Sequence, residues 1–216
     1  MTTQYFDVAI VGAGAAGIAT AASLKQRQRH LSVVLIDPAE THYYQPGWTM
    51  VGAGVFKKEE TARSTASVMP SYVTQIRGTV ASFQPDENSV RLEDGKALTY
   101  GSLVVAAGLK LDWAAIEGLE EALGRNGVTS NYRYDLAPYT WELVQKMRGE
   151  KAIFTQPPMP IKCAGAPQKA MYLSCSTWMQ VGKIKDIDVS FCNAGPVLFG
   201  CADYVPPLME YVDRYG

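Results

Sequence analysis

The chain has 216 residues, 47% of them hydrophobic, and a formal net charge of −1, which is the balance of an ordinary globular protein. With 20 basic and 21 acidic residues and no basic run, we predict no nucleic-acid partner. No apolar run reaches about 18 residues, which excludes a membrane-spanning helix, and the early first strand leaves no room for a targeting peptide. Four cysteines without a Cys-x-x-Cys spacing indicate a reducing compartment, so we expect a cytoplasmic protein, and we expect no metal site.

The first forty residues predict one βαβ unit. An apolar run at 5–11 is typical of a buried parallel strand, and the Ala-rich segment that follows it to residue 28 has its apolar residues at helical spacing. A second apolar strand at 32–36 ends before Pro38, where proline stops the run. Strand, helix and strand together occupy the roughly thirty residues expected of such a unit.

A glycine fingerprint, G-x-G-x-x-G, joins the predicted strand to the predicted helix. Gly12 permits a tight turn, Gly14 lets the backbone approach a pyrophosphate, and Gly17 lets the helix pack closely on the strand. The helix N-terminus then offers free N–H groups to the diphosphate. Asp37 follows Gly17 by twenty residues, where an acid binds ribose hydroxyls and disfavours the 2′-phosphate of NADP. These residues predict a dinucleotide site, and they leave the choice between FAD and NAD open.

The middle of the chain predicts a small antiparallel meander that leads back into the buried sheet. Residues 40–71 are expected to form a long irregular loop. Short strand patterns separated by turns, among them a strong Asp-Gly hairpin signal, follow at 72–77, 79–83, 90–93 and 98–100. The wholly apolar run 103–107, followed by Gly108, is predicted to return to the sheet.

A helix is predicted from about residue 135 to Gly149, and after it a second α/β pattern begins near residue 150. That pattern comprises a strand at 152–155, a Pro/Gly loop at 156–167, a helix at 168–181, a strand at 187–191 and a helix from 204. We therefore predict an α/β fold in two parts. A Rossmann-like domain with the inserted antiparallel meander occupies 1–149, and the start of a second, unfinished Rossmann-like domain occupies 150–216.

The meander and the strand that ends in Ala106, Ala107 and Gly108 resemble those of the pyridine nucleotide–disulfide oxidoreductase superfamily. Its members place FAD on the first glycine fingerprint and end the returning strand in Ala-Thr-Gly, whereas alanine stands at position 107 here. The resemblance implies that 1–149 is an FAD-binding domain.

Three further segments resemble the sulfide:quinone oxidoreductases, in the branch that includes the mitochondrial enzyme. They are the loop 160–169, the Tyr-rich segment 42–49 and the segment 65–70, and the similarity extends from about residue 5 to the last residue. It implies that Cys163 is catalytic: it attacks the sulfur of sulfide, carries a persulfide and passes electrons through FAD to a quinone. The cofactor-binding positions implied by fingerprint and resemblance together are Gly12, Gly14, Ala15, Ala16, Gly17, Asp37, Pro38, Gln45, Val80, Ala106 and Gly108.

The residues around Cys163 point the same way. Cys163 precedes a predicted helix, with Lys162 beside it and Lys169 six residues on, and a helix N-terminus and a cation both favour the nucleophilic thiolate form of a cysteine. From these residues alone, one alternative for Cys163 stays open: its side chain only fills space in the loop, as a small hydrophobic residue does. The remaining cysteines are predicted to be structural: Cys175, Cys192 and Cys201.

The segment 156–163 argues against a nicotinamide nucleotide as electron donor. Relatives that oxidise NADH carry a second glycine fingerprint there, whereas this chain has three prolines, which supply no N–H groups for a phosphate. Two alternatives stay open: another enzyme of the superfamily, similar to type II NADH dehydrogenase or ferredoxin reductase, and a non-catalytic FAD-binding half-protein.

Full-length members of the resembled family are roughly twice as long as this chain. They add a second redox cysteine, a Gly-Asp segment that closes over the flavin, and a quinone pocket with amphipathic helices that hold the enzyme peripherally on a membrane surface. We therefore interpret the sequence as a fragment whose partners are sulfide and, through the absent half, a quinone and a membrane surface. Association into a homo-oligomer also stays open.

Overall fold

The computed structural model describes residues 4–216, which form two compact units. The first unit comprises the chain up to Tyr44 together with Ala62–Asp112, and the second comprises Gln45–Thr61 and Trp113–Gly216. The chain therefore crosses between the units three times. This division differs from the boundary expected after residue 149, which falls inside the second unit.

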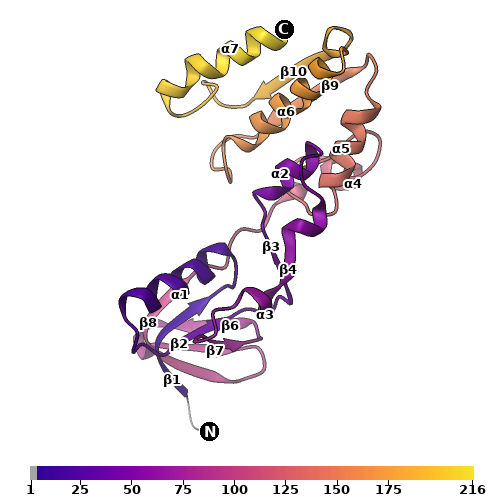
Figure 1. Ribbon diagram of the computed structural model, residues 1–216. Coiled ribbons are helices and arrows are strands. Elements are labelled where there is room, and N and C mark those ends of the chain that lie inside the picture. The colour runs from indigo at the N-terminus through magenta and orange to yellow at the C-terminus, as the bar shows by residue number, and fades with distance from the viewer. Residues whose placement is uncertain (1–3) are drawn as a thin grey trace. The chain divides into compact units, whose positions relative to one another are not determined.

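The first unit is built on a six-stranded sheet (Figure 1). Its strands, in spatial order, are β5 (Thr74–Ile76), β2 (Val33–Ile36), β1 (Gln4–Val11), β8 (Ala97–Val105), β7 (Ser89–Leu92) and β6 (Val80–Gln84). Strand β1 pairs in parallel with β2 and β8, and β2 pairs in parallel with β5. Strands β6, β7 and β8 form the predicted antiparallel meander. The α/β fold class with a parallel sheet and an inserted meander is thus confirmed.

Two strand predictions in this unit were wrong in detail. The segment expected as the first strand of the meander is instead β5, an edge strand of the parallel part of the sheet, because Val34 and Ile36 of β2 pair with it. The separate strands expected at 98–100 and 103–107 are one strand, β8, which runs through Gly101 and pairs with β1 on both sides of it, through Tyr100 and Ser102.

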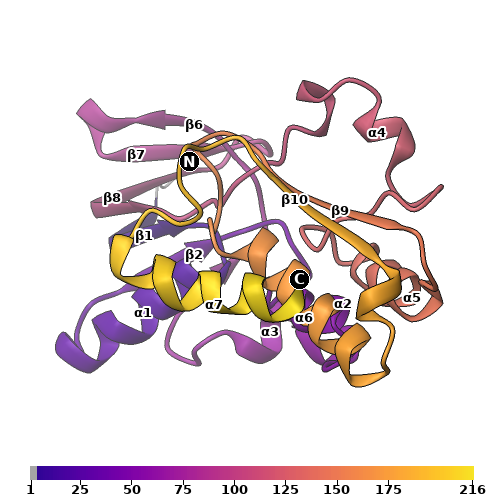
Figure 2. The same cartoon turned by 90° about the horizontal axis from the view of Figure 1, so that it is seen from above.

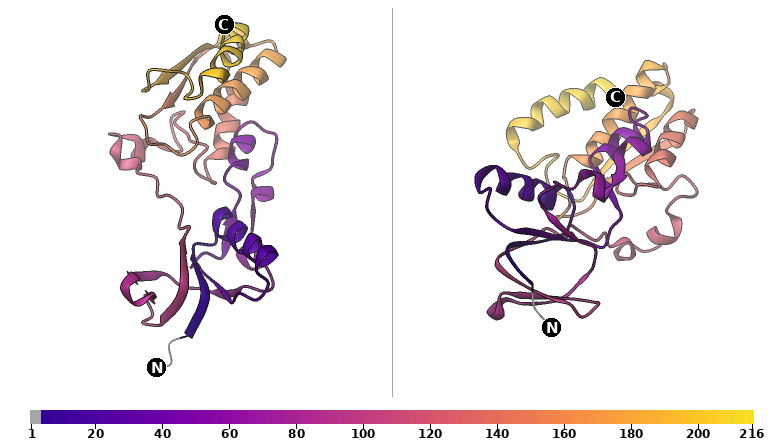
Figure 3. Two further views of the ribbon diagram at one scale, coloured as in Figure 1. Left: turned by 90° about the vertical axis from the view of Figure 1, so that its left-hand side faces the viewer. Right: turned by 60° about the horizontal axis from the view of Figure 1, so that its bottom comes forward.

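Both faces of the central strands are buried, which explains their near-continuous apolar sequence. Ile10 of β1 packs with Ala21 of helix α1 (Ala15–Arg27), which lies along one face of the sheet (Figure 3). The alternate residue, Ala9, packs on the other face with Val90 of the meander. Both Ala9 and Ile10 have no exposed surface. Burial on both faces is thus what is expected of the parallel strands at the centre of this sheet.

The segment expected to be irregular, 40–71, contains regular structure. Strands β3 (Thr41–Tyr43) and β4 (Ala62–Ser64) pair in antiparallel fashion, and the short helix α3 (Thr65–Val68) follows, capped by Ser64. Helix α2 (Gly47–Gly52) and a 3₁₀ turn at Lys58–Thr61 belong to the second unit. These short elements have too few residues to show a periodicity in the sequence.

The second unit is built on two parallel strands, β9 (Lys151–Gln156) and β10 (Asp188–Asn193), which run side by side in Figure 2. Helix α6 (Ala166–Gln180) connects them, and α7 (Val205–Tyr215) follows β10. Helices α4 (Leu119–Ala122) and α5 (Ala137–Lys146) precede β9. The predicted restart of an α/β pattern is therefore present.

The core of the second unit explains why it begins before residue 149. Trp178 of α6, 2% exposed, packs with Val144 of α5 and Ala152 of β9. Its indole Nε1 donates a hydrogen bond of 2.9 Å to the carbonyl oxygen of Val144. Helix α2 joins the same unit, because Trp48 packs against Ala137 of α5. The helix that was assigned to the first domain thus has its apolar partners in the second.

Candidate active site

The glycine loop between β1 and α1 is shaped by close approaches of the backbone. Gly12 has φ +106°, and a Cβ there would lie 2.3 Å from the carbonyl oxygen of Ala106, at the end of β8. A Cβ at Gly17 would lie 1.9 Å from the carbonyl oxygen of Gly12. By contrast, a Cβ at Gly14 would meet no atom within 4 Å. Gly12 and Gly17 therefore serve the fold, whereas Gly14 borders open space, as a phosphate-binding position does.

The N-terminus of α1 is free to bind an anion. Gly14 is its N-cap and provides no side-chain cap, and the first turn contains no acidic residue. Ile18 N–H makes the first intrahelical hydrogen bond, to the carbonyl oxygen of Gly14 at 3.1 Å. The N–H groups of Ala15, Ala16 and Gly17 precede it and therefore have no helical acceptor. Ala15 and Ala16 are exposed. These are the groups that the sequence predicts to bind a diphosphate.

Asp37 is fixed beside this loop by the backbone. Its Oδ2 accepts a hydrogen bond from Ala13 N at 2.6 Å, and its Oδ1 accepts one from Ala39 N at 2.7 Å. Because each carboxylate oxygen has a second lone pair, both oxygens can still accept a hydrogen bond from a ribose hydroxyl. The loop itself is joined to β2, since Gly12 N donates to the carbonyl oxygen of Ile36 at 2.8 Å.

The other predicted cofactor positions are distributed over both units. Pro38 is exposed next to Asp37, and Gly108 is exposed after β8 with φ +77°. Ala106 N donates to the carbonyl oxygen of Val11 at 2.7 Å, which holds the end of β8 beside the glycine loop. Val80, half-buried, begins β6 in the same unit, whereas Gln45 belongs to the second unit.

One neighbour of the glycine loop was not assigned from the sequence. The ring nitrogen Nδ1 of His42 lies 3.1 Å from the carbonyl oxygen of Ala13, whose N–H holds Asp37. His42 and Ala13 are 29 residues apart, so no local spacing could have revealed the contact.

Cys163 lies in the second unit, in the loop before α6. Its side chain is exposed, and Nζ of Lys169, on the first turns of the helix, lies 4.0 Å from its Sγ. The carbonyl oxygen of Cys163 accepts a hydrogen bond from Ala166 N at 2.9 Å. The predicted combination of thiol, helix start and lysine is therefore present. Tyr132 also reaches this loop, donating to the carbonyl oxygen of Lys162, and the sequence carried no signal for it.

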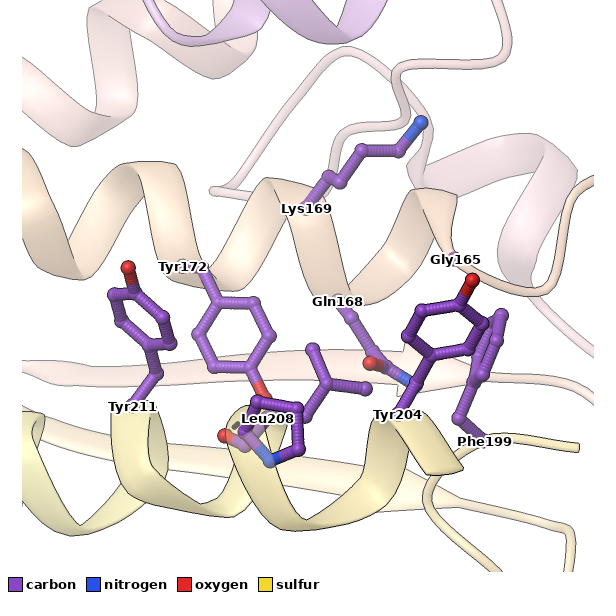
Figure 4. Close-up of a pocket in the computed structure, with 9 residues that line it drawn as sticks. Gly165, Gln168, Lys169, Tyr172, Phe199, Tyr204, Leu208 and Tyr211 are labelled. Atoms are coloured by element: carbon purple, nitrogen blue, oxygen red, sulfur yellow. Dashed lines mark hydrogen bonds between the residues drawn. The ribbon is translucent and has the colours of Figure 1, made fainter. Parts of the chain in front are cut away.

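An aromatic groove of about 440 Å³ lies on the other side of α6, between this helix and α7 (Figure 4). Its lining includes the rings of Tyr172, Tyr204 and Tyr211, and Tyr172 donates a hydrogen bond of 3.1 Å to the carbonyl oxygen of Leu208. The Lys169 side chain points away from these rings. None of the predicted site residues lines the groove.

Within residues 4–216, no three or more His, Cys, Asp and Glu side chains gather as metal ligands do. No helix there has both the length and the apolar character needed to cross a membrane.

The fold and the glycine-loop site define the class of protein. The family described as pyridine nucleotide-disulphide oxidoreductase matches residues 6–142, and the chain belongs to this family. Its relatives include the mitochondrial sulfide:quinone oxidoreductases of Mus musculus and Dictyostelium discoideum, at 39% and 40% identity. Both alignments cover 97% of this chain, and they cover 46% and 47% of the relatives. The resemblance found in the sequence motifs is confirmed.

The solved structures agree on the fold. The sulfide:quinone oxidoreductase of Aquifex aeolicus superposes with a TM-score of 0.80 at 23% identity, over 99% of this chain and 49% of that protein. The chain thus spans about half the length of the relatives that it matches.

Proposed function

We propose that this chain is the FAD-binding and sulfide-oxidising part of a sulfide:quinone oxidoreductase. The observation that carries the proposal is the identity of 39–40%, across 97% of the chain, with relatives of that name. In the proposed reaction sulfide is oxidised at Cys163, and the electrons pass to FAD and then to a quinone. The first unit binds the cofactor and the second supplies the thiol.

The first unit fits FAD. The open space at Gly14 and the free N–H groups at the start of α1 suit a diphosphate, and the Asp37 carboxylate suits ribose hydroxyls. Pro38, Val80, Ala106 and Gly108 are the further proposed cofactor positions in this unit, and Gln45 is a proposed position that belongs to the second unit. When bound, FAD supplies an acceptor for two electrons.

Cys163 fits the role of the sulfur-carrying thiol. Converting its thiol and hydrogen sulfide into a persulfide forms one S–S bond and releases two protons and two electrons. The exposed side chain admits a small anion such as hydrosulfide, and the Lys169 ammonium 4.0 Å from Sγ attracts that anion to the sulfur. The Lys169 ammonium and the N-terminus of α6 both place positive charge close to the Cys163 loop.

The loop between β9 and α6 favours a sulfur donor over a nicotinamide nucleotide. It spans 157–165 and carries Pro157, Pro158 and Pro160, whose nitrogens have no hydrogen to donate to a phosphate. A tight glycine turn between strand and helix, as at Gly12 in the first unit, is therefore not formed here.

The test is the visible spectrum of the purified chain, before and after anaerobic addition of sulfide. We expect flavin absorption that sulfide bleaches, and mass spectrometry should find one added sulfur on Cys163. The Cys163→Ser variant should keep its colour on adding sulfide, whereas the matched control Cys201→Ser, at another exposed cysteine, should bleach as the wild type does.

Other outcomes of this experiment contradict the proposal. Bleaching by NADH but not by sulfide would indicate the NADH-oxidising alternative. A colourless protein that does not bind added FAD would show a module without this redox function. The quinone step is tested separately, by reoxidation of the reduced flavin with a soluble quinone under anaerobic conditions, and contact with a membrane surface by co-sedimentation with lipid vesicles.

A further inference from the structure

Cys163 has an unusual backbone conformation for a residue with a side chain. Its φ is +59°, in the left-handed region, where Cβ crowds the carbonyl oxygen that follows. Residues other than glycine occupy this region mainly when surrounding contacts compensate for the crowding. The loop that carries the proposed nucleophile must therefore be held by specific interactions.

Tyr132 provides them from a distant part of the chain. Its hydroxyl donates to the carbonyl oxygen of Lys162 and lies 3.4 Å from that of Cys163. The Lys162 ammonium lies 5.6 Å from the centre of the Tyr132 ring, so ring and hydroxyl both contact the loop. Tyr132 precedes α5 and is 31 residues from Cys163, so this contact exists only in the folded second unit.

The conformation at Cys163 fixes where its sulfur lies. Ala166 N donates to the Cys163 carbonyl oxygen at 2.9 Å, and the Tyr132 hydroxyl lies 3.4 Å from the same oxygen. With the backbone held at both ends, the thiol faces Lys169, with 4.0 Å between Sγ and Nζ. The Lys169 side chain extends away from the aromatic groove, which leaves its ammonium free to face the thiol (Figure 4).

We propose that Tyr132 is a positioning residue, whose hydroxyl holds the left-handed turn at Cys163 and thereby keeps the thiol beside the Lys169 ammonium. The inference rests on the proposed function, in which Cys163 is the thiol that binds sulfide. The Tyr132 hydroxyl contacts the carbonyl oxygens of Lys162 and Cys163, so Tyr132 acts on the reaction through Cys163.

The protonation of Tyr132 is compatible with this role. Burial, together with the charge of a Cys163 thiolate, raises the pKa of Tyr132 to about 12. Free thiols ionise near pH 8–9, roughly three units lower. The phenol therefore keeps its proton, and its hydrogen bond, throughout the range in which a thiol becomes a nucleophile.

The test measures alkylation of each cysteine by iodoacetamide, with peptide mapping by mass spectrometry. In Tyr132→Phe, which keeps the ring and removes the hydroxyl, alkylation of Cys163 should slow by about two- to fivefold, the size of an exposed ion-pair effect. Lys169→Met should slow it equally, and Lys169→Arg should preserve most of the rate. The control Tyr139→Phe, which removes another tyrosine hydroxyl that contacts backbone, should leave it unchanged.

Three readouts separate positioning from a general loss of structure. The double variant of Tyr132→Phe and Lys169→Met should react no more slowly than Lys169→Met alone, because both changes remove the same contact. About 1 M salt should abolish the difference between wild type and Tyr132→Phe, because it screens the Lys169 charge. Cys175, which is 3% exposed, should stay protected in every variant.

The proposal is overturned if Cys163 reacts at the wild-type rate in Tyr132→Phe, if the two effects multiply in the double variant, or if Cys175 becomes reactive together with Cys163. Alkylation requires neither sulfide nor flavin. A failure of sulfide to bleach the flavin would therefore refute the proposed function and leave this measurement valid. Unchanged alkylation in a chain that does oxidise sulfide would refute the role of Tyr132 alone.

Discussion

Gly12→Ala tests how the glycine loop is held. Gly12 has φ +106°, and a Cβ there would lie 2.3 Å from the Ala106 carbonyl oxygen, which must retreat by about 1 Å to reach an ordinary contact. The positive φ costs an alanine about 1–2 kcal/mol, and crowding against backbone costs about 1–3 kcal/mol more. We therefore expect the free energy of unfolding to fall by about 3 kcal/mol. In a chain of this size the Tm should fall by roughly 6–12 °C.

Gly14→Ala is the matched control, two residues away in the same loop. Its φ is −70°, and a Cβ would meet no atom within 4 Å, so only a small capping loss of up to about 1 kcal/mol is expected. Thermal unfolding of both variants and the wild type, followed by far-ultraviolet circular dichroism without added cofactor, compares them directly. A Tm for Gly12→Ala within about 2 °C of that for Gly14→Ala would refute the steric argument.

Three further changes test the two units. Asp37→Asn should weaken FAD binding by about tenfold or more, measured by quenching of flavin fluorescence, because a charged acceptor for ribose hydroxyls is lost; unchanged affinity would remove Asp37 from the site. Trp178→Phe should lower the free energy of unfolding by about 2 kcal/mol in urea, because it leaves the buried Val144 carbonyl oxygen without its donor; a loss below about 0.5 kcal/mol would show that water replaces that donor. Burial raises the pKa of the Cys175 thiol to about 11, against an ordinary value of 9.0. The unfolded chain therefore loses this proton first, and stability present below pH 9 should decline between pH 9 and 11. Cys175→Ala should show a smaller decline, and an equal decline would assign it to other groups.

The glycine loop of the proposed dinucleotide site was predictable because its demands are local. The loop requires a tight turn, close packing of helix on strand and room for an anion, and a glycine at a fixed position meets each requirement. Asp37 follows at the end of the next strand. The long-range contacts around the glycine loop and around Cys163 were not predictable in the same way. His42 approaches the carbonyl oxygen of Ala13, and Tyr132 reaches the loop of Cys163, from 29 and 31 residues away. Such pairs share no spacing or periodicity that the sequence displays.

Domain boundaries were harder to predict than secondary structure, for a related reason. The helix α5 has an apolar face that was visible in the sequence, and its apolar spacing does not say which neighbour covers it. In the structure Val144 packs with Trp178, so α5 belongs to the second unit. Likewise, the strand pattern near residue 75 was visible, but its parallel partner β2 was not.

From the sequence alone follow the α/β class and the βαβ unit with its glycine loop and acidic residue, because these depend on periodicity or on residue types that a short segment requires. The candidate thiol and the family follow from the resemblance of sequence motifs to a known family. Folding determines the parallel pairing of β5, the continuous strand β8, the division into two units and the left-handed turn at Cys163. These features depend on contacts between residues far apart in the chain, and such contacts form only when the apolar faces of different segments are buried against one another.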